Sequence, residues 1–408
     1  MMRICMVVFS YYPDDPRPRR EAEALVDAGD SVDVFCLQDH GQIHRRQIHG
    51  VEVHRLPVKR SRGGKLQYLW EYALFLFLSF WVLSWHYLKK RYHIVHVHNM
   101  PDALVFSALL PRLAGSKIVL DLHDPMPEVF MTKYGIGRSH PLTKILLWFE
   151  MLSIRFAHLV LTPNRAFREL FVARGCPAAK IHVVMNSPDL AVFRPTTQEA
   201  EASKESSPFG PPSPRLPDED RFVIMYHGTV AERHGLKTAL EAVALFQEEI
   251  PGLRFEVYGD GDYVASFLRL VSEMGLGETV GYHGHVSLEE IASAIDGIDA
   301  GIIPNERSVL TEINLPTRIF EYLCMGKPVI APKTRGIEDY FDESSMFFFE
   351  PGDVESLAAQ IRIVWRNNER RLSVLQEGMK VHERHCWAAE RARFVELLHN
   401  LAVESPEA

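Results

Sequence analysis

The sequence predicts an α/β protein with two domains, each built around a doubly wound parallel sheet. The chain has 408 residues, of which 47% are hydrophobic and 24% charged, an ordinary composition for a globular protein of two or three domains. In both halves, short apolar runs alternate with longer stretches of helical periodicity, which is typical of a parallel sheet covered by helices on both faces. One polar segment, 195–220, interrupts this alternation. We therefore expect one domain at 1–194 and a second at 221–371.

The first half contains six apolar runs that we expect to be strands and five stretches that we expect to be helices. The strands are 3–9, 31–37, 94–98, 117–122, 159–162 and 181–184. The helices are 19–28, 69–91, 102–113, 141–157 and 166–173. Because the strands are almost continuously apolar, both faces of their sheet should be buried.

The second half repeats the alternation after the polar segment. Segment 195–220 is rich in Pro, Ser and Glu and cannot bury enough apolar surface to fold, so we expect a flexible linker. Strands are expected at 222–227, 254–258, 280–283, 300–303, 328–331 and 346–349. Helices are expected at 236–249, 263–274, 288–294, 318–325 and 354–367. A last helix at about 372–401, in the C-terminal segment 372–408, has no strand after it and should pack back toward the first domain.

Charge and cysteine usage narrow the possible functions. The 45 basic and 53 acidic residues give a net charge of −8, which argues against a general nucleic-acid binder. The five cysteines are scattered and form no C-x-x-C pair, so a disulfide framework or a structural zinc site is not expected and a reducing cytoplasm fits best. The N-terminal MMRICMVVFSYY fits a first buried strand better than a signal peptide.

Segment 66–91 departs from the pattern of a soluble helix. Its uncharged stretch, 72–85, is shorter than the roughly 20 residues that cross a bilayer. Its tryptophans are Trp70, Trp81 and Trp85, and Lys89, Lys90 and Arg91 follow them. Aromatic rings with cations at one end suit docking at a membrane interface. The alternative is a buried helix of the first domain.

The residues that carry chemistry should lie just after strands, because ligands bind outside the carboxyl ends of parallel strands. The segment YHGTVAERHGL, 226–236, is one such place. Gly228 lets the backbone approach a ligand, and the following helix start attracts anions. Arg233 can add a charge-assisted contact to a phosphate. The alternative is an ordinary strand–helix turn with a solvent-facing arginine.

The segment LPTRIFEYLCMGKPVIA, 315–331, is the second such place. Thr317 suits a helix start, Arg318 lies in the first turn, and Glu321 follows one turn later on the same face. The cation can neutralise a diphosphate, while the carboxylate, which only accepts hydrogen bonds, can take two hydroxyls of a ribose. The alternative is an exposed ion pair between residues three apart.

These motifs, in this order and spacing, resemble family 4 of the retaining glycosyltransferases, the glycosyl transferases group 1. The segments concerned are HGT at 227–229, YGDGD at 258–262, Pro304-Asn305, and FEYLCMGKPVIA at 320–331. In the first half, SYYPDDPRPRREAEALVDAGDSVDVFCL, VHVHNMPDALVF and LDLHDPMPE are similar to the family's first strand–loop–helix and to its acceptor-domain loops. The resemblance covers nearly the whole chain outside the linker. It implies the GT-B fold, two Rossmann-like domains facing across a cleft.

The resemblance also implies roles in the second domain. Glu321 matches the second Glu of the family's E-x7-E motif, which holds the donor ribose, whereas the first Glu would fall at Ile313, with Glu312 one position away. Either the backbone groups of Asn314 and Leu315 or a slightly shifted Glu312 can replace it. Thr229 stands where Arg is common and His234 where Lys is common, which leaves more of the phosphate charge to Arg233. The donor-binding residues expected are Gly228, Thr229, Arg233, Gly259, Gly261, Asn314, Leu315, Thr317, Arg318 and Glu321.

In the first domain, His123 matches a histidine that faces the reacting sugar in the family. We expect it to act in catalysis with Arg233, Arg318 and Glu321; the alternative is a residue that caps a loop. Further acceptor-loop candidates are Asp124, Glu128, His96 and His98. The spacing of His96 and His98 does not by itself specify a zinc site, because zinc needs further ligands. Asp260-Gly261-Asp262 spells D-x-D, a metal motif in the other large glycosyltransferase fold, but its glycine-rich turn favours close approach of the backbone to the donor.

The function that follows is retaining transfer of a hexose-type sugar from a UDP- or GDP-sugar to a glycan or lipid-linked acceptor, in envelope polysaccharide or glycolipid synthesis. No tightly bound cofactor and no metal requirement are expected, and no nucleic-acid partner. The protein should be cytoplasmic, with peripheral contact to the inner face of the cell membrane if 66–91 docks there. The alternatives are a sugar-nucleotide epimerase and a non-catalytic sugar-nucleotide-binding or membrane-scaffolding protein.

Overall fold

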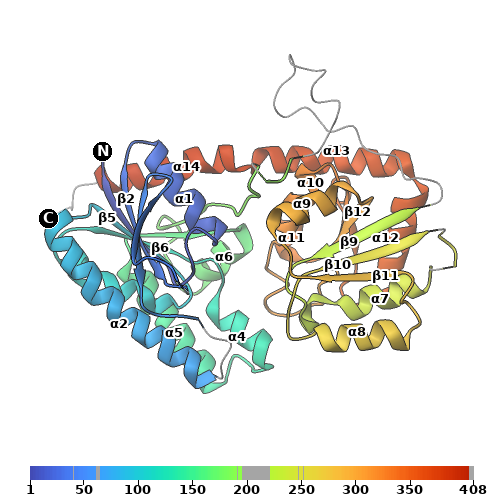
Figure 1. Cartoon of the computed structure of the whole chain (residues 1–408), viewed down its shortest axis with the longest axis horizontal. Coiled ribbons are helices and arrows are strands. Elements are labelled where there is room, and N and C mark those ends of the chain that lie inside the picture. The colour runs from blue at the N-terminus through green and yellow to red at the C-terminus, as the bar shows by residue number, and fades with distance from the viewer. Residues whose placement is uncertain are drawn as a thin grey trace, which may run out of the picture. The chain divides into compact units, whose positions relative to one another are not determined.

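A computed structural model describes residues 1–39, 41–60, 65–190, 192–194, 221–246, 248–250 and 252–403 (Figure 1). The chain forms two compact units: Met1–Asn186 with Ala388–Ala408, and Ser187–Trp387. The chain therefore passes from one unit to the other twice, and the last residues return to the first unit. The expected linker at 195–220 lies outside the described residues.

The N-terminal unit contains an eight-stranded sheet in the order β3-β4-β2-β1-β5-β6-β7-β8. Its strands are β1 (Arg3–Val7), β2 (Ser31–Leu37), β3 (Arg45–Ile48), β4 (Val51–Leu56), β5 (Ile94–His98), β6 (Lys117–Asp121), β7 (Leu159–Thr162) and β8 (Ile181–Val183). All neighbours are parallel except the hairpin β3–β4, which is antiparallel. This hairpin was not expected, because its outer strand is exposed and polar and shows no apolar run in the sequence.

Helices cover both faces of this sheet. They are α1 (Pro16–Asp27), α2 (Lys65–Lys90), the 3-10 helix η1 (Asp102–Ala108), α3 (Leu109–Leu113), α4 (Met126–Tyr134), α5 (Pro141–Phe156), α6 (Arg165–Ala173) and α14 (Trp387–Val403). Helix η1 packs between α2 and α5. Helix α4 was not predicted, and 102–113, expected as one helix, divides at Leu109 into η1 and α3.

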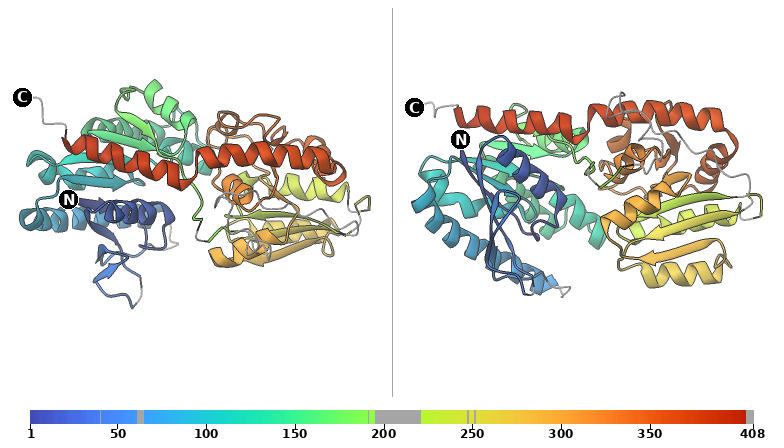
Figure 2. Two further views of the ribbon diagram at one scale, coloured as in Figure 1. Left: turned by 90° about the horizontal axis from the view of Figure 1, so that it is seen from above. Right: turned by 45° about the horizontal axis from the view of Figure 1, so that its top comes forward.

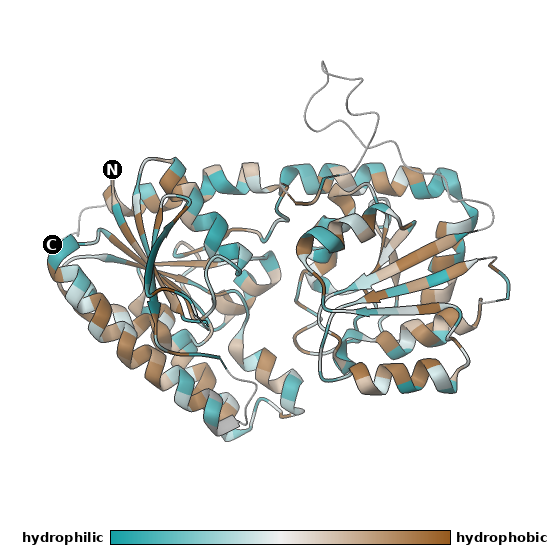
Figure 3. Ribbon diagram, in the orientation of Figure 1, coloured by the Kyte–Doolittle hydropathy of each residue, from teal (hydrophilic) through white to brown (hydrophobic). Residues whose placement is uncertain are grey.

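Helix α2 has one buried face and one exposed apolar face. Phe75 and Leu83 are fully buried, and the Phe75 ring packs on Phe9 of the first strand–helix loop. The exposed side chains are Leu69, Trp70, Phe77, Trp81, Trp85 and Leu88. From Trp70 onward these five residues recur every three, four or seven positions and so form one stripe along the helix, where Figure 3 shows repeated hydrophobic bands. Among the described residues, no helix is long and apolar enough to cross a membrane.

The C-terminal unit contains a six-stranded, fully parallel sheet in the order β11-β10-β9-β12-β13-β14. Its strands are β9 (Phe222–His227), β10 (Leu253–Tyr258), β11 (Val280–Gly284), β12 (Ala300–Ile302), β13 (Val329–Pro332) and β14 (Phe347–Phe349). Its helices are η2 (Glu232–His234), α7 (Leu236–Ala244), α8 (Val264–Glu273), α9 (Leu288–Asp296), α10 (Arg318–Cys324), α11 (Arg335–Glu338), α12 (Val354–Arg366) and α13 (Asn368–Arg384). A core of buried aliphatic and aromatic side chains joins β9, β10 and β12 to α7 and α12.

The last helix of the sequence is two helices, which corrects the single helix expected at about 372–401. Helix α13 belongs to the C-terminal unit and α14 to the N-terminal unit. At the break, His385 has φ −123° and ψ 15°, and its carbonyl accepts a hydrogen bond from the Ser187 hydroxyl instead of a helical amide. Helix α14 lies along the N-terminal unit in Figures 1 and 2, where Phe394 is fully buried against His96.

Candidate functional site

The first half of the candidate site lies where α10 meets the end of β9. Arg318 Nη1 donates to the carbonyl of His227 at 2.5 Å, and its guanidinium carbon lies 4.6 Å from the centre of the Tyr226 ring. Glu321 Oε2 lies 3.2 Å from His227 Nε2, and the Glu321 side chain is 15% exposed. Both residues therefore face the end of β9, and the alternative of an exposed ion pair does not hold.

His227 is a site residue that the sequence analysis treated only as the end of a strand. Burial, and next to it the charge of Arg318, lower its pKa to about 3. The ring is therefore neutral at physiological pH where it contacts the carboxylate of Glu321, while the backbone carbonyl of the same residue binds Arg318. The signal was present in the sequence, since His227 directly precedes the glycine of the HGT motif.

Gly228 is required by this packing. Its φ is +122°, a conformation that side chains rarely adopt, and a Cβ there would lie 2.7 Å from Arg318 Nη1. Its amide donates to the carbonyl of Tyr258 at 3.0 Å, which joins the loop after β9 to the loop after β10. The glycine thus lets Arg318 lie directly on the backbone.

The next residues give the loop one free cation. His234 Nδ1 lies 2.6 Å from the carbonyl of Thr229, and burial, followed by the charge of Arg318, lowers the pKa of His234 to about 3. A neutral ring therefore fills the position where the family often has lysine, while Thr229 itself is exposed. Arg233 is half-buried, and its side chain makes no hydrogen bond or ion pair to another described residue.

Gly259 and Gly261 shape the loops after β9 and β10, a structural role that the sequence did not indicate. A Cβ on Gly259, whose φ is +131°, would lie 1.9 Å from the carbonyl oxygen of Gly228. A Cβ on Gly261 would lie 2.1 Å from that of Val230. The space beside both glycines is therefore filled by the loop after β9, and contact with a donor through their backbone stays a prediction.

The residues before α10 form a rigid turn. Glu312 pairs with Arg307 and accepts a hydrogen bond from the Arg335 amide at 3.3 Å, so its carboxylate has protein partners. A Cβ on Gly336 would lie 2.4 Å from the Asn314 carbonyl oxygen, which shows how closely that loop packs. Leu315 is 8% exposed, and Thr317 occupies the N-cap position of α10 without a capping hydrogen bond from its side chain.

The D-x-D sequence lies in an exposed turn. Asp260 Oδ1 accepts a hydrogen bond from the Gly261 amide at 2.8 Å. Within the described part of the chain, the groupings of His, Asp and Glu close enough to share an ion are Glu21/His96/His98/Asp121 and Asp33/Glu52/His54. Both lie in the N-terminal unit, so neither includes the D-x-D residues.

In the N-terminal unit, His123 lies at the carboxyl end of β6 beside a small cavity. The cavity has a volume of about 140 Å³, and its lining includes Ser10, His98, His123 and Asp124. His123 Nε2 lies 3.0 Å from His98 Nδ1 and 3.2 Å from Asp121 Oδ2. The His123 side chain is 19% exposed, so it is held from behind and open in front.

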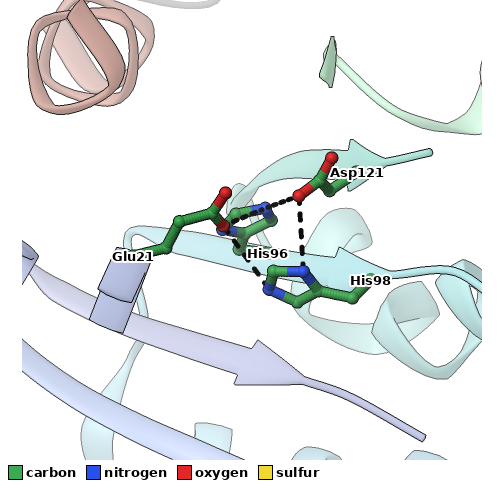
Figure 4. Close-up of side chains that lie close together, drawn as sticks. All are labelled: Glu21, His96, His98 and Asp121. Atoms are coloured by element: carbon green, nitrogen blue, oxygen red, sulfur yellow. Dashed lines mark ion pairs between the residues drawn. The ribbon is translucent and has the colours of Figure 1, made fainter. Parts of the chain in front are cut away.

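Behind His123 lies a buried charge network of Arg17, Glu21, His96, His98 and Asp121, four of which are drawn in Figure 4. Arg17 donates to both oxygens of Asp121, at 2.7 and 2.8 Å. Burial alone would raise the pKa of Asp121, but the charge of Arg17 holds it well below its usual value. Burial raises the pKa of Glu21 and lowers that of His96, so the network contains one fixed ion pair among groups that favour their neutral forms.

Of the acceptor-loop candidates, Glu128 has a structural partner. Its carboxylate is 5% exposed and pairs with Arg174 from the end of α6. The carbonyl of Asp124 accepts a hydrogen bond from Asn99 at 2.8 Å, and Asp124 lines the small cavity. The ion pair with Arg174 therefore occupies the carboxylate of Glu128. Asp124 lies beside His123 at the small cavity.

Comparisons with known proteins place both units in one family. Residues 16–187 match the family model of the glycosyl transferase 4-like domain, and residues 212–381 match that of the glycosyl transferases group 1. The sulfoquinovosyl transferase SQD2 of Arabidopsis thaliana is 24% identical over 72% of this chain, and the aligned part is 54% of the plant protein's length.

Solved structures share the fold of the whole chain. A sucrose-phosphate synthase from Thermosynechococcus elongatus superposes with a TM-score of 0.77 at 18% identity and covers 99% of this chain and 100% of its own. Anabaena HepE in complex with UDP-glucose gives 0.71 at 17% identity, over 98% of this chain and 100% of its own. The chain therefore belongs to family 4 of the glycosyltransferases, the glycosyl transferases group 1 with the GT-B fold, and is a transferase of class EC 2.4.

Proposed function

We propose that the protein is a retaining glycosyltransferase that moves a hexose-type sugar from a UDP- or GDP-sugar to a glycan or lipid-linked acceptor in envelope polysaccharide or glycolipid synthesis. The observation that supports this most is the placement of Arg318 and Glu321 on one helix turn, both facing His227 at the end of β9. HepE, whose fold is similar, is described with UDP-glucose. The donor would lie against Gly228, with its diphosphate near Arg318 and Arg233 and its ribose near Glu321.

The proposed reaction breaks the bond between the sugar's anomeric carbon and the diphosphate and forms a bond from that carbon to an acceptor hydroxyl oxygen. Positive charge develops on the ring and negative charge on the leaving phosphate. Arg318 and Arg233 would stabilise that phosphate without a metal ion. The acceptor's proton would pass to the leaving phosphate on the same face of the sugar, which retains the anomeric configuration.

His123 would contact the donor sugar or orient the acceptor. Its ring is held by Asp121 and His98 and opens onto the small cavity, as a positioned hydrogen-bonding group requires. Asp124, beside it in the same cavity, is the acceptor-contact candidate that the geometry leaves available.

A membrane contact through 66–91 belongs to the same proposal. The exposed stripe of α2 contains Trp70, Trp81 and Trp85, and Lys89 lies 4.9 Å from the Trp85 ring. Aromatic rings next to cations are suited to the interface between lipid headgroups and acyl chains. Such a contact would bring the enzyme to a membrane-borne acceptor.

The test is transfer by Arg318→Ala and Glu321→Ala, with Arg269→Ala and Glu273→Ala as controls in an exposed ion pair of the same unit. We expect each site variant to lose at least about 100-fold in kcat/KM, because each removes a charged contact to the donor. The control variants should keep full activity, and all four should melt within a few degrees of the wild type. Near-normal turnover in both site variants would rule out the proposed site.

Product analysis with donor alone separates the alternatives. An epimerase would interconvert sugars without an acceptor, and a non-catalytic protein would bind the donor without transfer or hydrolysis. The transferase predicts a glycoside product that appears only when an acceptor is present, with its anomeric configuration readable by NMR.

A further inference from the structure

The N-terminal unit has a second and larger cavity beside α5, and it is strongly basic. Its volume is about 590 Å³, and it lies between α5, the end of α6 and the loop leading to β8. The cationic residues lining it are Arg138, Lys144, Arg155, Arg174 and Lys180, and the acidic one is Glu150. Such an excess of positive charge around a cavity favours an anionic ligand.

Two of these cations are used by the protein itself. Arg174 donates to both oxygens of Glu150, at 2.9 and 3.0 Å, and also pairs with Glu128. Lys180 Nζ donates to the carbonyl of Ile154 at 2.6 Å. The other three, Arg138, Lys144 and Arg155, are exposed, and their side chains make no hydrogen bond or ion pair to the rest of the described chain. Three cations are therefore free to meet a ligand.

The cavity borders an exposed apolar strip on the same helix. Lys144, Trp148 and Arg155 line the cavity at helical spacing, so they share one face of α5. The neighbouring face exposes Leu142, Ile145 and Phe149, and Trp148, 52% exposed, stands between the two faces. A free phosphate in water would need only the cations, whereas an anion carried on a lipid would also need such an apolar strip.

This strip continues toward α2 through α3. Arg112 of α3 donates to the carbonyl of Phe156 at the end of α5 at 2.8 Å, and Tyr87 of α2 donates to the carbonyl of Ala114 at 2.9 Å. Helix α3 exposes Leu109, Leu110 and Leu113 between these contacts. Helix α3, which is bonded to the C-terminal ends of both α2 and α5, thus adds exposed apolar side chains to those of the two longer helices.

We propose that the cavity beside α5 binds the phosphate-bearing headgroup of an anionic membrane lipid while the exposed side chains of α5 enter the membrane interface. Lys144, Arg155 and Arg138 supply charge to the phosphate, and Trp148 lies at the level of the headgroups. The inference rests on the proposed membrane contact of the enzyme, but different residues carry it from those of α2 or of the donor site.

The experiment is co-sedimentation of the full chain with vesicles of phosphatidylcholine, with and without phosphatidylglycerol. The variant is Lys144→Gln/Arg155→Gln, and the matched control is Lys237→Gln/Arg269→Gln, which removes the same charge from exposed positions of the C-terminal unit. We expect the first variant to lose about tenfold or more of its partition onto anionic vesicles. The control variant should bind as the wild type does.

Three results would overturn the proposal. One is an equal loss of binding to anionic vesicles in both double variants, which would show that net charge alone explains the effect. Another is unchanged binding of Lys144→Gln/Arg155→Gln. The third is stabilisation by inorganic phosphate in the absence of lipid. If phosphate raised the melting temperature of the wild type but not of Lys144→Gln/Arg155→Gln, relative to sodium chloride at equal ionic strength, the cavity would be a site for a soluble anion.

Two further measurements keep the proposals separate. Trp81→Ser/Trp85→Ser tests the contact of α2 on the same vesicles, so the two helices can fail independently. Calorimetric binding of UDP and of GDP to the wild type and to Lys144→Gln/Arg155→Gln tests the donor site. Failure of the wild type to bind either nucleotide would count against the proposed transfer reaction and leave the lipid result standing.

Discussion

At the end of β9, His227 is in contact with two charged side chains of α10. His227 touches Arg318 through its backbone carbonyl and Glu321 through its ring. Because its pKa is lowered to about 3, the His227 ring adds no charge of its own beside Glu321. The cation of Arg318 and the carboxylate of Glu321 are therefore the charged groups that this end of β9 would offer to a donor in the proposed reaction.

The neutral histidines also make the stability of the C-terminal unit depend on pH. Burial lowers the pKa of His227 to about 3 and that of His382 to about 4, against about 6.5 in an unfolded chain. At pH values between the folded and unfolded pKa, the unfolded chain binds more protons at these histidines than the folded chain does. The contribution of the two neutral rings to the free energy of unfolding is therefore complete above about pH 6.5 and is lost as the pH falls toward the folded pKa. We expect the urea midpoint to drop between about pH 7 and pH 5 and to drop less in His382→Gln.

His285→Gln, at an exposed position, is the control for that measurement. It should follow the wild-type curve. If His382→Gln showed the same pH slope as the wild type, the buried ring would not be a source of the dependence.

Asp121 positions His123 in the N-terminal unit, and we expect Asp121→Asn to lower kcat by roughly tenfold or more with little change in KM for the donor. The asparagine leaves only one oxygen for both Arg17 and the His123 ring, so the ring loses its fixed orientation. The measurement is steady-state transfer. Asp33→Asn is the matched control, because Asp33 is equally buried but binds Lys90 and Tyr92 away from His123. Equal losses of kcat in both variants would point to general destabilisation.

At the level of elements, the loops after β9 and β10 are locked together by glycines. The Gly228 amide binds the Tyr258 carbonyl, and the Val230 amide binds the Asp260 carbonyl, each at 3.0 Å. Gly259 and Gly261 allow this approach because a side chain on either would overlap a carbonyl oxygen. The loop after β9 is thus supported by the loop after β10, and the amides of Gly228 and Val230 are taken by its carbonyl groups.

Gly259→Ala should therefore destabilise the C-terminal unit by about 1–3 kcal/mol and weaken UDP binding, because the alanine is strained at φ +131° and meets the Gly228 carbonyl. Gly277→Ala is the control, since a Cβ there meets no atom within 4 Å. Urea unfolding and calorimetry measure the two effects. Wild-type stability in Gly259→Ala would show that the loops are not held as closely as described.

For the whole molecule, the C-terminal residues complete the N-terminal unit. Helix α14 is joined to it by Met185 N to Glu390 at 3.1 Å and by His399 to Asp30 at 2.7 Å, and it buries Phe394 and Leu398 completely. Helix α14, which follows the C-terminal unit in the chain, is therefore part of the core of the N-terminal unit.

Phe394→Ala should destabilise the N-terminal unit by about 3–5 kcal/mol, because it opens a cavity beside His96. Hydrogen exchange would show faster exchange in β1 and β5 and unchanged protection in β9 and β10. The exposed Val403→Ala is the control. A uniform loss of protection across both sheets would mean that the two units do not respond separately.

The site could be predicted in part because its key pair is local. Arg318 and Glu321 lie three residues apart, so helical periodicity alone places them on one face. The bond from Arg318 to His227 joins residues 91 positions apart, and that from Arg17 to Asp121 joins residues 104 positions apart. No local pattern specifies such contacts, which explains why His227 was not recognised as part of the site and why Arg17, Glu21 and Asp121 were not expected beside His96 and His98.

The alternation of strands and helices, the GT-B family and the helix turn that carries Arg318 and Glu321 could be read from the sequence, because they depend on periodicity and on short motifs. The folded chain was needed to show that Gly259 and Gly261 support a loop, that Glu128 is taken by Arg174, and that the last helix divides between the two units. Each of these outcomes depends on which distant backbone or charge fills the space beside a residue, and that is fixed by packing rather than by the residue's neighbours in the chain.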